Sequence, residues 1–571
     1  MIENVVGRGL AYLNYDGRRR EILQEYTLTG KLSVAASFMQ DESEDGGFEE
    51  VSQPLAKARQ NLEQLEAQAR GVTASVEMTQ GEYERRIAKL QRDLTRAWNG
   101  NQRVTSLKIA IQCSKLLVDP RVPAFYPSMF VLVTDILDTF GRCVFERLKG
   151  AAVEELGRMG GQKESLPNDF AGGDVGAEVK EMCRNWIYKT ACIRELLPRL
   201  YVEMALLECY RFLDVSGDFA KHIIRLSQSI RGIGDPLVAV YARWYLARQA
   251  AHLVHDSAQL RETLFSTVTD FLYTFHEIAS ETGERSKQLL ASGISFPLYL
   301  RLLSPAVGWI MAQVGAGAPK EVFRSLLATY RECCGNAMVL RHIIDAFDGG
   351  YWSGQLPAML QLVKEAAPGD APLSLLQALS ADGLTGPALN PPVVASGLAD
   401  LYRAMSSAMV HSPPPPESRL PFLNEAWKAI TRMKDPVTFT RHAAAFIELL
   451  LAAFTDREVL LLMGDLVKRL VASGGSGEGG AGSTVAAPVS TLPHLSALLT
   501  AIVEAEVTRV GREAVESPGM PLRFSGVITS ESFSRLLDLF HSDSKPALCR
   551  RLLSQLLKVP GCFSDSVLVN V

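Results

Sequence analysis

Apolar residues recur along most of the chain with the three- and four-residue spacing of amphipathic helices. This spacing brings apolar side chains from successive turns onto one helix face, which a neighbouring helix can cover. Three stripes show the pattern clearly: Met129, Leu132, Val133, Ile136, Leu137 and Phe140; Leu237, Val240, Tyr241, Trp244 and Tyr245; and Leu423, Ala426, Trp427, Ile430 and Met433. The two-residue alternation of half-buried strands never lasts beyond a few residues. The chain is therefore predicted to be all-α.

Short turn sequences separate the predicted helices. Examples are Asp119-Pro120, the run 232–236 and Asp435-Pro436, which contain residues that stop or start helices. No repeat of fixed length is present in the sequence. Successive helices without long crossovers are nevertheless typical of an α-solenoid, here of irregular HEAT-like helical hairpins. Each hairpin has an apolar face that only its neighbour can cover.

Composition divides this array into five predicted parts. The stretch 40–54 holds six acidic residues and no basic one, so it cannot bury enough apolar surface to offset its ordering entropy. The parts are a mostly disordered N-terminal tail at 1–56, a charged helical segment at 57–101, the main α-solenoid at 102–472, a low-complexity flexible insert at 473–490, and further solenoid helices at 491–571.

The final residues indicate that the array is C-terminally truncated. A solenoid normally ends in a polar capping helix. Here Val567, Leu568, Val569 and Val571 would leave an apolar face with no successor to cover it. We therefore expect the intact array to continue.

Composition narrows the class of protein further. Hydrophobic residues make up 47% of the 571 residues, which excludes wholesale disorder. The 59 basic and 63 acidic residues nearly balance, and no basic stripe dominates, so a dedicated nucleic-acid binder is not expected. The longest apolar stretch, 443–454, is too short to span a bilayer, so we expect membrane contact only through partners. Nine cysteines without a CxxC spacing indicate reduced thiols in the cytoplasm.

No enzyme motif is present. The sequence has no GxxxxGK[ST], HExxH or GxSxG pattern, and no GxGxxG follows a predicted strand. The nine histidines are dispersed, without the cysteine or carboxylate neighbours that a metal site needs. We therefore predict a protein that is not an enzyme and that uses no cofactor and no metal.

Four segments resemble a known family. They lie at 97–141, 193–201, 230–243 and 423–430. Together they resemble the vacuolar protein sorting protein 35 family, and within it the branch of retriever large subunits, which are paralogues of the retromer large subunit. The resemblance runs from about Trp98 to the C-terminus, with the inserts as gaps.

The resemblance implies a non-catalytic scaffold of an endosomal coat that recycles membrane cargo to the plasma membrane. It implies an arrestin-fold subunit near the N-terminal end of the solenoid. It also implies a metallophosphoesterase-fold subunit near the C-terminal end, whose site a truncation would remove. Further implied partners are a coiled-coil and COMM-domain complex and a sorting nexin adaptor, with the protein cytoplasmic and peripheral on endosomes. The competing interpretation is an unrelated α-solenoid, such as a nuclear transport receptor or a phosphatase regulatory subunit.

The resemblance also places a partner-binding motif, Pro-Arg-Leu-Tyr, on Pro198, Arg199, Leu200 and Tyr201. In retromer this motif supports binding of the arrestin-fold subunit. Arg199 could fork to a carboxylate of that partner, and Leu200 and Tyr201 would add apolar anchor area. The alternative is that Arg199 pairs internally with a neighbouring glutamate, Glu195 or Glu203, and shapes the hairpin.

A second segment of the resemblance contributes Asp235 and Arg243 as partner-binding candidates. A Pro-Leu pair at 236–237 precedes Tyr241, Arg243 and Tyr245, as in retromer. Asp235 is the predicted N-cap of the helix that Pro236 begins. We interpret this segment mainly as architecture and secondarily as a partner surface.

Overall fold

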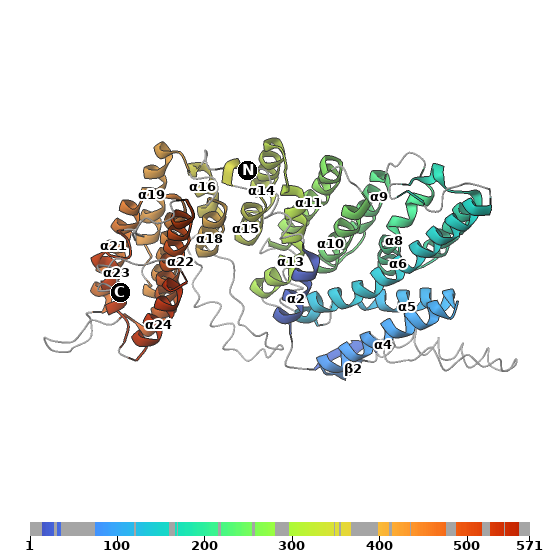
Figure 1. The fold of residues 1–571 in the computed structure, drawn as a ribbon, viewed down its shortest axis with the longest axis horizontal. Coiled ribbons are helices and arrows are strands. Elements are labelled where there is room, and N and C mark those ends of the chain that lie inside the picture. Colours follow the sequence, from blue (N-terminus) through green and yellow to red (C-terminus); the bar gives the residue numbers. More distant parts are fainter. Residues whose placement is uncertain are drawn as a thin grey trace. The chain divides into compact units, whose positions relative to one another are not determined.

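The computed structural model describes residues 14–27, 31–35, 75–118, 122–158, 166–167, 170–214, 219–253, 257–279, 296–347, 349–352, 356–366, 398–409, 414–433, 435–474, 487–516, 526–541 and 543–558. Helices supply nearly all of their regular structure, together with one antiparallel pair of short strands (Figure 1). The chain divides into two compact units, with the boundary between Val314 and Gly315. The prediction of an all-α solenoid is confirmed.

The first unit contains the elements up to α13. They are α2 (Tyr15–Glu25), β1 (Leu32–Ala35), β2 (Ser75–Met78), α4 (Gln80–Asn99), α5 (Arg103–Leu116), η3 (Pro123–Phe125), α6 (Tyr126–Arg158), η4 (Gly172–Asp174), α7 (Ala177–Ala191), α8 (Leu196–Ala205), η5 (Leu207–Phe212), α9 (Ala220–Ile230), α10 (Pro236–Leu253), α11 (Ser257–Ala279) and α13 (Phe296–Gly315). Helices close in sequence pack together: α4 on α5, α5 on α6 and α8, and α10 on α8, α9 and α11.

The N-terminal residues depart from the prediction of a mostly disordered tail. Helix α2 packs on α6, and Ile22 at its centre is completely buried. The Ser128 hydroxyl donates to the Tyr26 carbonyl at 2.8 Å, and the Tyr26 hydroxyl donates to the Arg301 carbonyl at 2.9 Å. Strand β1 pairs with β2, Leu32 opposite Met78. The prediction for 1–56 is therefore wrong at α2 and β1, and the rest of that tail lies outside the described residues.

Helix α6 runs through the first unit, and α8 and α10 pack close to it. The side chains of Phe130 and Trp244 stack with ring centroids 4.9 Å apart, and Trp244 is fully buried. Gly141 allows the close approach of α6 to the end of α8, since a Cβ there would lie 2.1 Å from the Ala205 carbonyl oxygen. The core of this unit thus contains packed aromatic rings between α6 and α10, and a close contact between α6 and the end of α8.

The second unit repeats the stacking of helical hairpins. Its elements are α14 (Lys320–Cys333), α15 (Ala337–Ala346), η6 (Gly349–Tyr351), α16 (Leu356–Ala366), α18 (Leu398–Met409), α19 (Pro416–Thr431), α20 (Pro436–Ala453), α21 (Asp456–Gly474), η8 (Val489–Thr491), α22 (Leu492–Glu516), α23 (Glu531–Asp538) and α24 (Lys545–Leu556). Helices α15, α18, α20, α22 and α24 pack in succession, while α16 packs on α19 and α21 on α23. This succession is that of a solenoid.

The predicted apolar stripes fall where they were expected. Those at 129–140 and 237–245 lie in α6 and α10, and the third lies in α19 apart from Met433, which follows the end of the helix. Helix α4 confirms the helical character of part of 57–101, whereas β2 was not predicted. Residues 475–486 of the insert and the apolar terminus 559–571 lie outside the described residues. None of the helices in the described ranges is long and apolar enough to cross a membrane.

Candidate functional site

The Pro198 to Tyr201 motif lies in the first two turns of α8, and most of it faces the core. Leu200 is 2% exposed and Tyr201 is fully buried. The Tyr201 ring packs against Tyr245 of α10, with ring centroids 5.5 Å apart, and Pro198 is also buried. The side chains of Leu200 and Tyr201 are therefore buried within the first unit, and a role of either in partner binding stays a prediction. The Tyr201 side chain packs α8 against α10.

Arg199 differs from the rest of the motif because its side chain is half-buried and reaches the surface. Both glutamates that could neutralise it are taken: Glu195 pairs with Lys115 at 2.7 Å, and Glu203 pairs with Arg225. Within the described residues the Arg199 guanidinium has no ion pair and no hydrogen bond. The internal pairing that would make Arg199 a purely structural residue is absent there, so its guanidinium is available to an outside acceptor.

Asp235 acts as the predicted cap. Its carboxylate accepts a hydrogen bond from the backbone N–H of Val238 at 3.0 Å, which satisfies a donor in the first turn of α10. Pro236 begins the helix, where its missing N–H costs no hydrogen bond. The capping prediction is confirmed, and a role of Asp235 in partner binding stays a prediction.

Arg243 lies in the middle of α10 and is only 3% exposed. Burial lowers the pKa of its guanidinium to about 10, with Asp270 raising it and Arg231 lowering it further. Its Nε is buried without a hydrogen-bond acceptor. The Arg243 side chain is therefore too buried for the direct partner contact that the resemblance implies. Its charge has no close counter-ion within the described residues.

Arg248, five residues further along α10, has several partners. It donates to Asp138 of α6 at 2.6 Å, and its guanidinium lies 3.9 Å from the centroid of the Tyr15 ring of α2. Asp138 also accepts hydrogen bonds from Tyr245 and Gln249, at 3.0 and 2.7 Å. This cluster ties α2, α6 and α10 together, and sequence reasoning missed it because its members are more than a hundred residues apart.

A half-buried pair of aromatic rings joins α4 and α7, and sequence reasoning missed this too. Trp98 of α4 stacks on Trp186 of α7 with ring centroids 6.1 Å apart. Arg103 lies 5.8 Å from the Trp98 ring, and Lys189 lies 5.9 Å from the Trp186 ring. Tyr188, two residues after Trp186 in α7, is 69% exposed. Flat rings flanked by cations suit a partner segment with apolar and acidic side chains.

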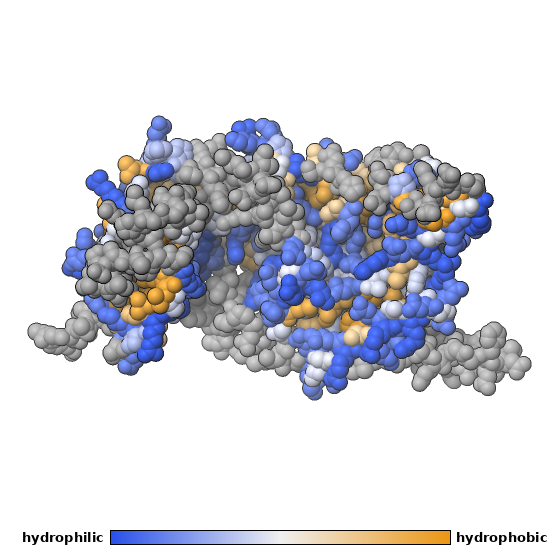
Figure 2. Space-filling model, viewed as in Figure 1, coloured by the Kyte–Doolittle hydropathy of each residue, from blue (hydrophilic) through white to orange (hydrophobic). Residues whose placement is uncertain are grey.

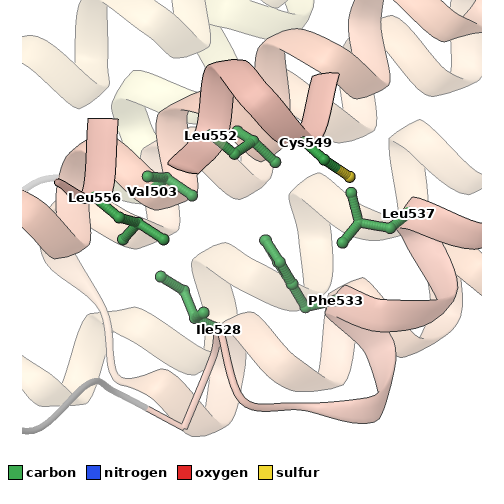
Figure 3. A pocket seen from close by; sticks show the side chains of 7 residues that line it. All are labelled: Val503, Ile528, Phe533, Leu537, Cys549, Leu552 and Leu556. Carbon is green, nitrogen blue, oxygen red and sulfur yellow. The ribbon is translucent and has the colours of Figure 1, made fainter. Parts of the chain in front are cut away.

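A small apolar cavity opens between α22, α23 and α24 (Figure 3). Its volume of about 10 Å³ has room for about one water molecule. Figure 2 shows apolar surface over the C-terminal helices of the second unit. Leu553 of α24 and Leu557, directly after its end, are 40% and 76% exposed. The residues that line the cavity are Val503, Ile528, Phe533, Leu537, Cys549, Leu552 and Leu556. These side chains offer no cluster of polar groups that could orient a ligand. We therefore interpret the cavity as a packing defect.

Metal chemistry has no support in the described residues. Among them no three histidine, cysteine or acidic side chains lie close enough together to hold an ion. The eight cysteines of the described ranges form no disulfide, and Cys562 lies outside those ranges.

Comparison with known proteins gives consistent results along the chain. The VPS35L family model matches residues 14–302, and the model of the VPS35L C-terminal domain matches residues 396–475. The "VPS35 endosomal protein-sorting factor-like" protein of Mus musculus is 37% identical over 79% of this chain and 43% of its own length. The protein of that name in Homo sapiens is 35% identical over 80% of this chain and 43% of its own length.

A more distant relative extends the comparison to almost the whole chain. "VPS35 endosomal protein sorting factor-like" of Dictyostelium discoideum is 30% identical over 98% of this chain and 50% of its own length. The chain therefore spans half or less of the length of these relatives. The first matched region contains α2 to α11, and with them every candidate residue discussed above for α8 and α10.

Proposed function

Since this chain belongs to the VPS35L family, we propose that it is a non-catalytic scaffold of an endosomal protein-sorting coat. The stacked hairpins support this proposal, because a solenoid displays long surfaces on which other subunits can assemble. The names of the relatives refer to endosomal protein sorting. We place the protein on endosomes as a peripheral component that reaches the membrane through its partners.

The finer assignment is a retriever-like complex that recycles membrane cargo to the plasma membrane. Its arrestin-fold subunit would bind the first unit, around α8. A metallophosphoesterase-fold subunit, a coiled-coil and COMM-domain complex and a sorting nexin adaptor complete the proposed assembly. The support for this assignment is the likeness of the four segments described above to the retriever branch.

Arg199 is the observation that carries the proposed contact with the arrestin-fold subunit. It is the member of the Pro-Arg-Leu-Tyr motif that reaches the surface, and its two candidate internal partners are engaged elsewhere. An arginine in this state can donate hydrogen bonds from its planar guanidinium to a carboxylate or to backbone carbonyls of a partner.

The test is to reverse this charge. We expect Arg199→Glu to weaken binding of the purified arrestin-fold subunit by about 30-fold or more, equivalent to about 2–5 kcal/mol, because an attractive contact becomes repulsive. Calorimetric titration of wild type and variant, at equal helicity by circular dichroism, measures the change. Arg194→Glu makes the same charge change at an exposed position just before α8 and should leave the affinity unaltered. Equal affinity of wild type and Arg199→Glu would remove the direct contact from the proposal.

The competing assignment is an unrelated solenoid scaffold. Affinity capture from cells followed by mass spectrometry separates the two. Recovery of an arrestin-fold protein with COMM-domain proteins supports the endosomal scaffold. Recovery of nuclear import cargo or of a phosphatase catalytic subunit in their place would favour a nuclear transport receptor or a phosphatase regulatory subunit.

A further inference from the structure

Helix α8 is buried on almost every side. Of its ten residues only three are not buried, namely Leu196, Arg199 and Glu203. Their spacing of three and four residues places them along one stripe of the helix. This stripe brings the guanidinium of Arg199, which is unpaired within the described residues, next to the carboxylate of Glu203.

Arg199 and Glu203 are natural partners that do not pair. Oppositely charged residues four positions apart on a helix are neighbours on its surface and commonly form an ion pair. Here the Glu203 carboxylate is held by other groups. It accepts a hydrogen bond from the Tyr210 hydroxyl at 2.9 Å and forms an ion pair with Arg225 of α9.

The three groups around Glu203 form a closed set of contacts. A terminal nitrogen of Arg225 also lies 3.4 Å from the Tyr210 hydroxyl oxygen. Burial, followed by the charge of Glu203, raises the pKa of Tyr210, so the hydroxyl keeps the proton that it donates. One cation and one neutral donor thus satisfy the Glu203 carboxylate without Arg199.

We propose that Arg225 and Tyr210 are positioning residues for the partner contact of Arg199. They hold the Glu203 carboxylate away from the Arg199 guanidinium, which keeps its charge and its donors for an acceptor on the partner. Without Arg225, the released Glu203 carboxylate neutralises Arg199. This inference rests on the proposed contact of Arg199 with the arrestin-fold subunit and concerns the control of that contact.

Glu195, the other glutamate near Arg199, is a weaker competitor. It is the N-cap residue of α8 and pairs with Lys115 of α5 at 2.7 Å. The side chains of this pair are 54% and 50% exposed, so water solvates Glu195 with or without Lys115. The Glu203 side chain is only 14% exposed, and a carboxylate so shielded needs another cation once Arg225 is removed.

The first measurement is the affinity for the purified arrestin-fold subunit by calorimetry. Arg225→Met should weaken binding about fivefold, because Arg199 must leave Glu203 before it can bind the partner. Adding Glu203→Gln to Arg225→Met should return the affinity to that of the wild type, since no carboxylate is left to compete. The conservative variant Arg225→Lys should keep the wild-type affinity.

Lys221→Met is the matched control. Lys221 lies on the same helix as Arg225 and pairs with Asp214 at 2.6 Å. Its replacement lowers the net charge by one, as Arg225→Met does, but leaves the contacts of Glu203 in place, so the affinity should not change. Tyr210→Phe removes one hydrogen bond of Glu203 without removing a charge and should weaken binding about twofold, which keeps the test open should Arg225→Met fail to fold.

The second measurement needs no partner. The reagent p-hydroxyphenylglyoxal modifies guanidinium groups, and an arginine held in an ion pair reacts more slowly than a free one. Mass spectrometry of peptides after limited modification gives the rate at Arg199. We expect this rate to fall about threefold in Arg225→Met, and to recover when Glu203→Gln is added.

The two measurements separate the positioning role from the contact itself. An affinity and a modification rate that both stay unchanged in Arg225→Met would overturn the inference and leave the contact of Arg199 in place. A loss of affinity that persists when Glu203→Gln is added would mean that Arg225 binds the partner directly, which also overturns it. Equal affinity of wild type and Arg199→Glu would remove the contact, and the positioning role with it, even where Arg225→Met slows the modification of Arg199.

Discussion

Helix α10 carries two buried arginines whose side chains differ in their partners. Arg248 has a carboxylate at 2.6 Å and an aromatic face at 3.9 Å, whereas Arg243 has no hydrogen bond within the described residues. The pKa values move in opposite directions: burial opposes both charges, but Tyr15 and Asp138 raise that of Arg248 above its ordinary value, while that of Arg243 falls to about 10. An arginine side chain thus stabilises the fold at position 248 and destabilises it at position 243.

The difference teaches how a scaffold can reserve a residue for binding. A charge that is fully paired inside the chain stabilises one arrangement of helices and has nothing left to offer a partner. A buried charge without a counter-ion lowers the stability of the folded chain. An anion of a partner that pairs with this charge relieves the penalty and so binds more tightly. Natural proteins commonly accept such local losses at binding sites. The predictions below test whether the two arginines really differ in this way.

The largest effect is expected from removing the counter-ion of Arg248. Asp138→Ala leaves a buried arginine with its carboxylate gone and also removes an acceptor from Tyr245 and Gln249. We expect a loss of about 3–5 kcal/mol in the free energy of unfolding of the first unit. Urea unfolding followed by tryptophan fluorescence measures it, because Trp244 lies in the same core.

Two comparisons sharpen that result. Asp270→Ala makes the same change beside Arg243 and should cost far less, since its partner Arg231 is mostly exposed. The double variant Asp138→Leu with Arg248→Met should recover most of the lost stability, because no unpaired charge remains. Similar losses at Asp138 and Asp270 would mean that Arg243 and Arg248 are alike.

A smaller effect of opposite sign is expected at Arg243 itself. Arg243→Met keeps the aliphatic stem but removes the unpaired charge, so the first unit should become more stable by about 1–2 kcal/mol. The matched variant Arg248→Met should be destabilised, because Asp138 loses its cation. Denaturant midpoints of the two variants against the wild type decide the matter, and a clear loss of stability in Arg243→Met would show that Arg243 is paired after all.

The sequence allowed prediction of the helices better than of their surfaces. The stripes in α6, α10 and α19 and the cap at Asp235 depend on residues a few positions apart, and the structure confirms them. Helix α2 was missed because it carries few apolar residues and docks through distant partners, such as the pair of Arg19 with Asp135 at 2.7 Å. Local periodicity contains no information about such contacts.

The candidate site was predictable only in part for the same reason. The motif on α8 was located by resemblance, but which of its side chains face outward depends on the helices packed behind it. Tyr201 faces Tyr245, and Arg199 is left unpaired because Lys115 and Arg225 hold the neighbouring glutamates. The stack of Trp98 on Trp186 likewise joins residues that only the fold brings together.

The smallest expected effect is a dependence on alkaline pH that belongs to Arg243 alone. Its pKa is about 10 in the folded chain and 12.5 when unperturbed, so between these values the unfolded chain binds more protons than the folded one. Stability contributed by this group must therefore rise with pH in that window, as the unfavourable buried charge is lost. The penalty is almost fully present below about pH 9 and should be relieved by about 1 kcal/mol at pH 10.5. The measurement is the difference in unfolding free energy between wild type and Arg243→Met from pH 8 to 10.5, since titration of lysines and tyrosines elsewhere cancels in that difference. The hydrogen bonds of Arg231 with Asp270 raise the pKa of Arg231, so this neighbouring arginine stays charged throughout the range and cannot imitate the effect. A difference that remains constant up to pH 10.5 would mean that Arg243 keeps its proton with the help of a counter-ion, and that the contrast between Arg243 and Arg248 does not exist in solution.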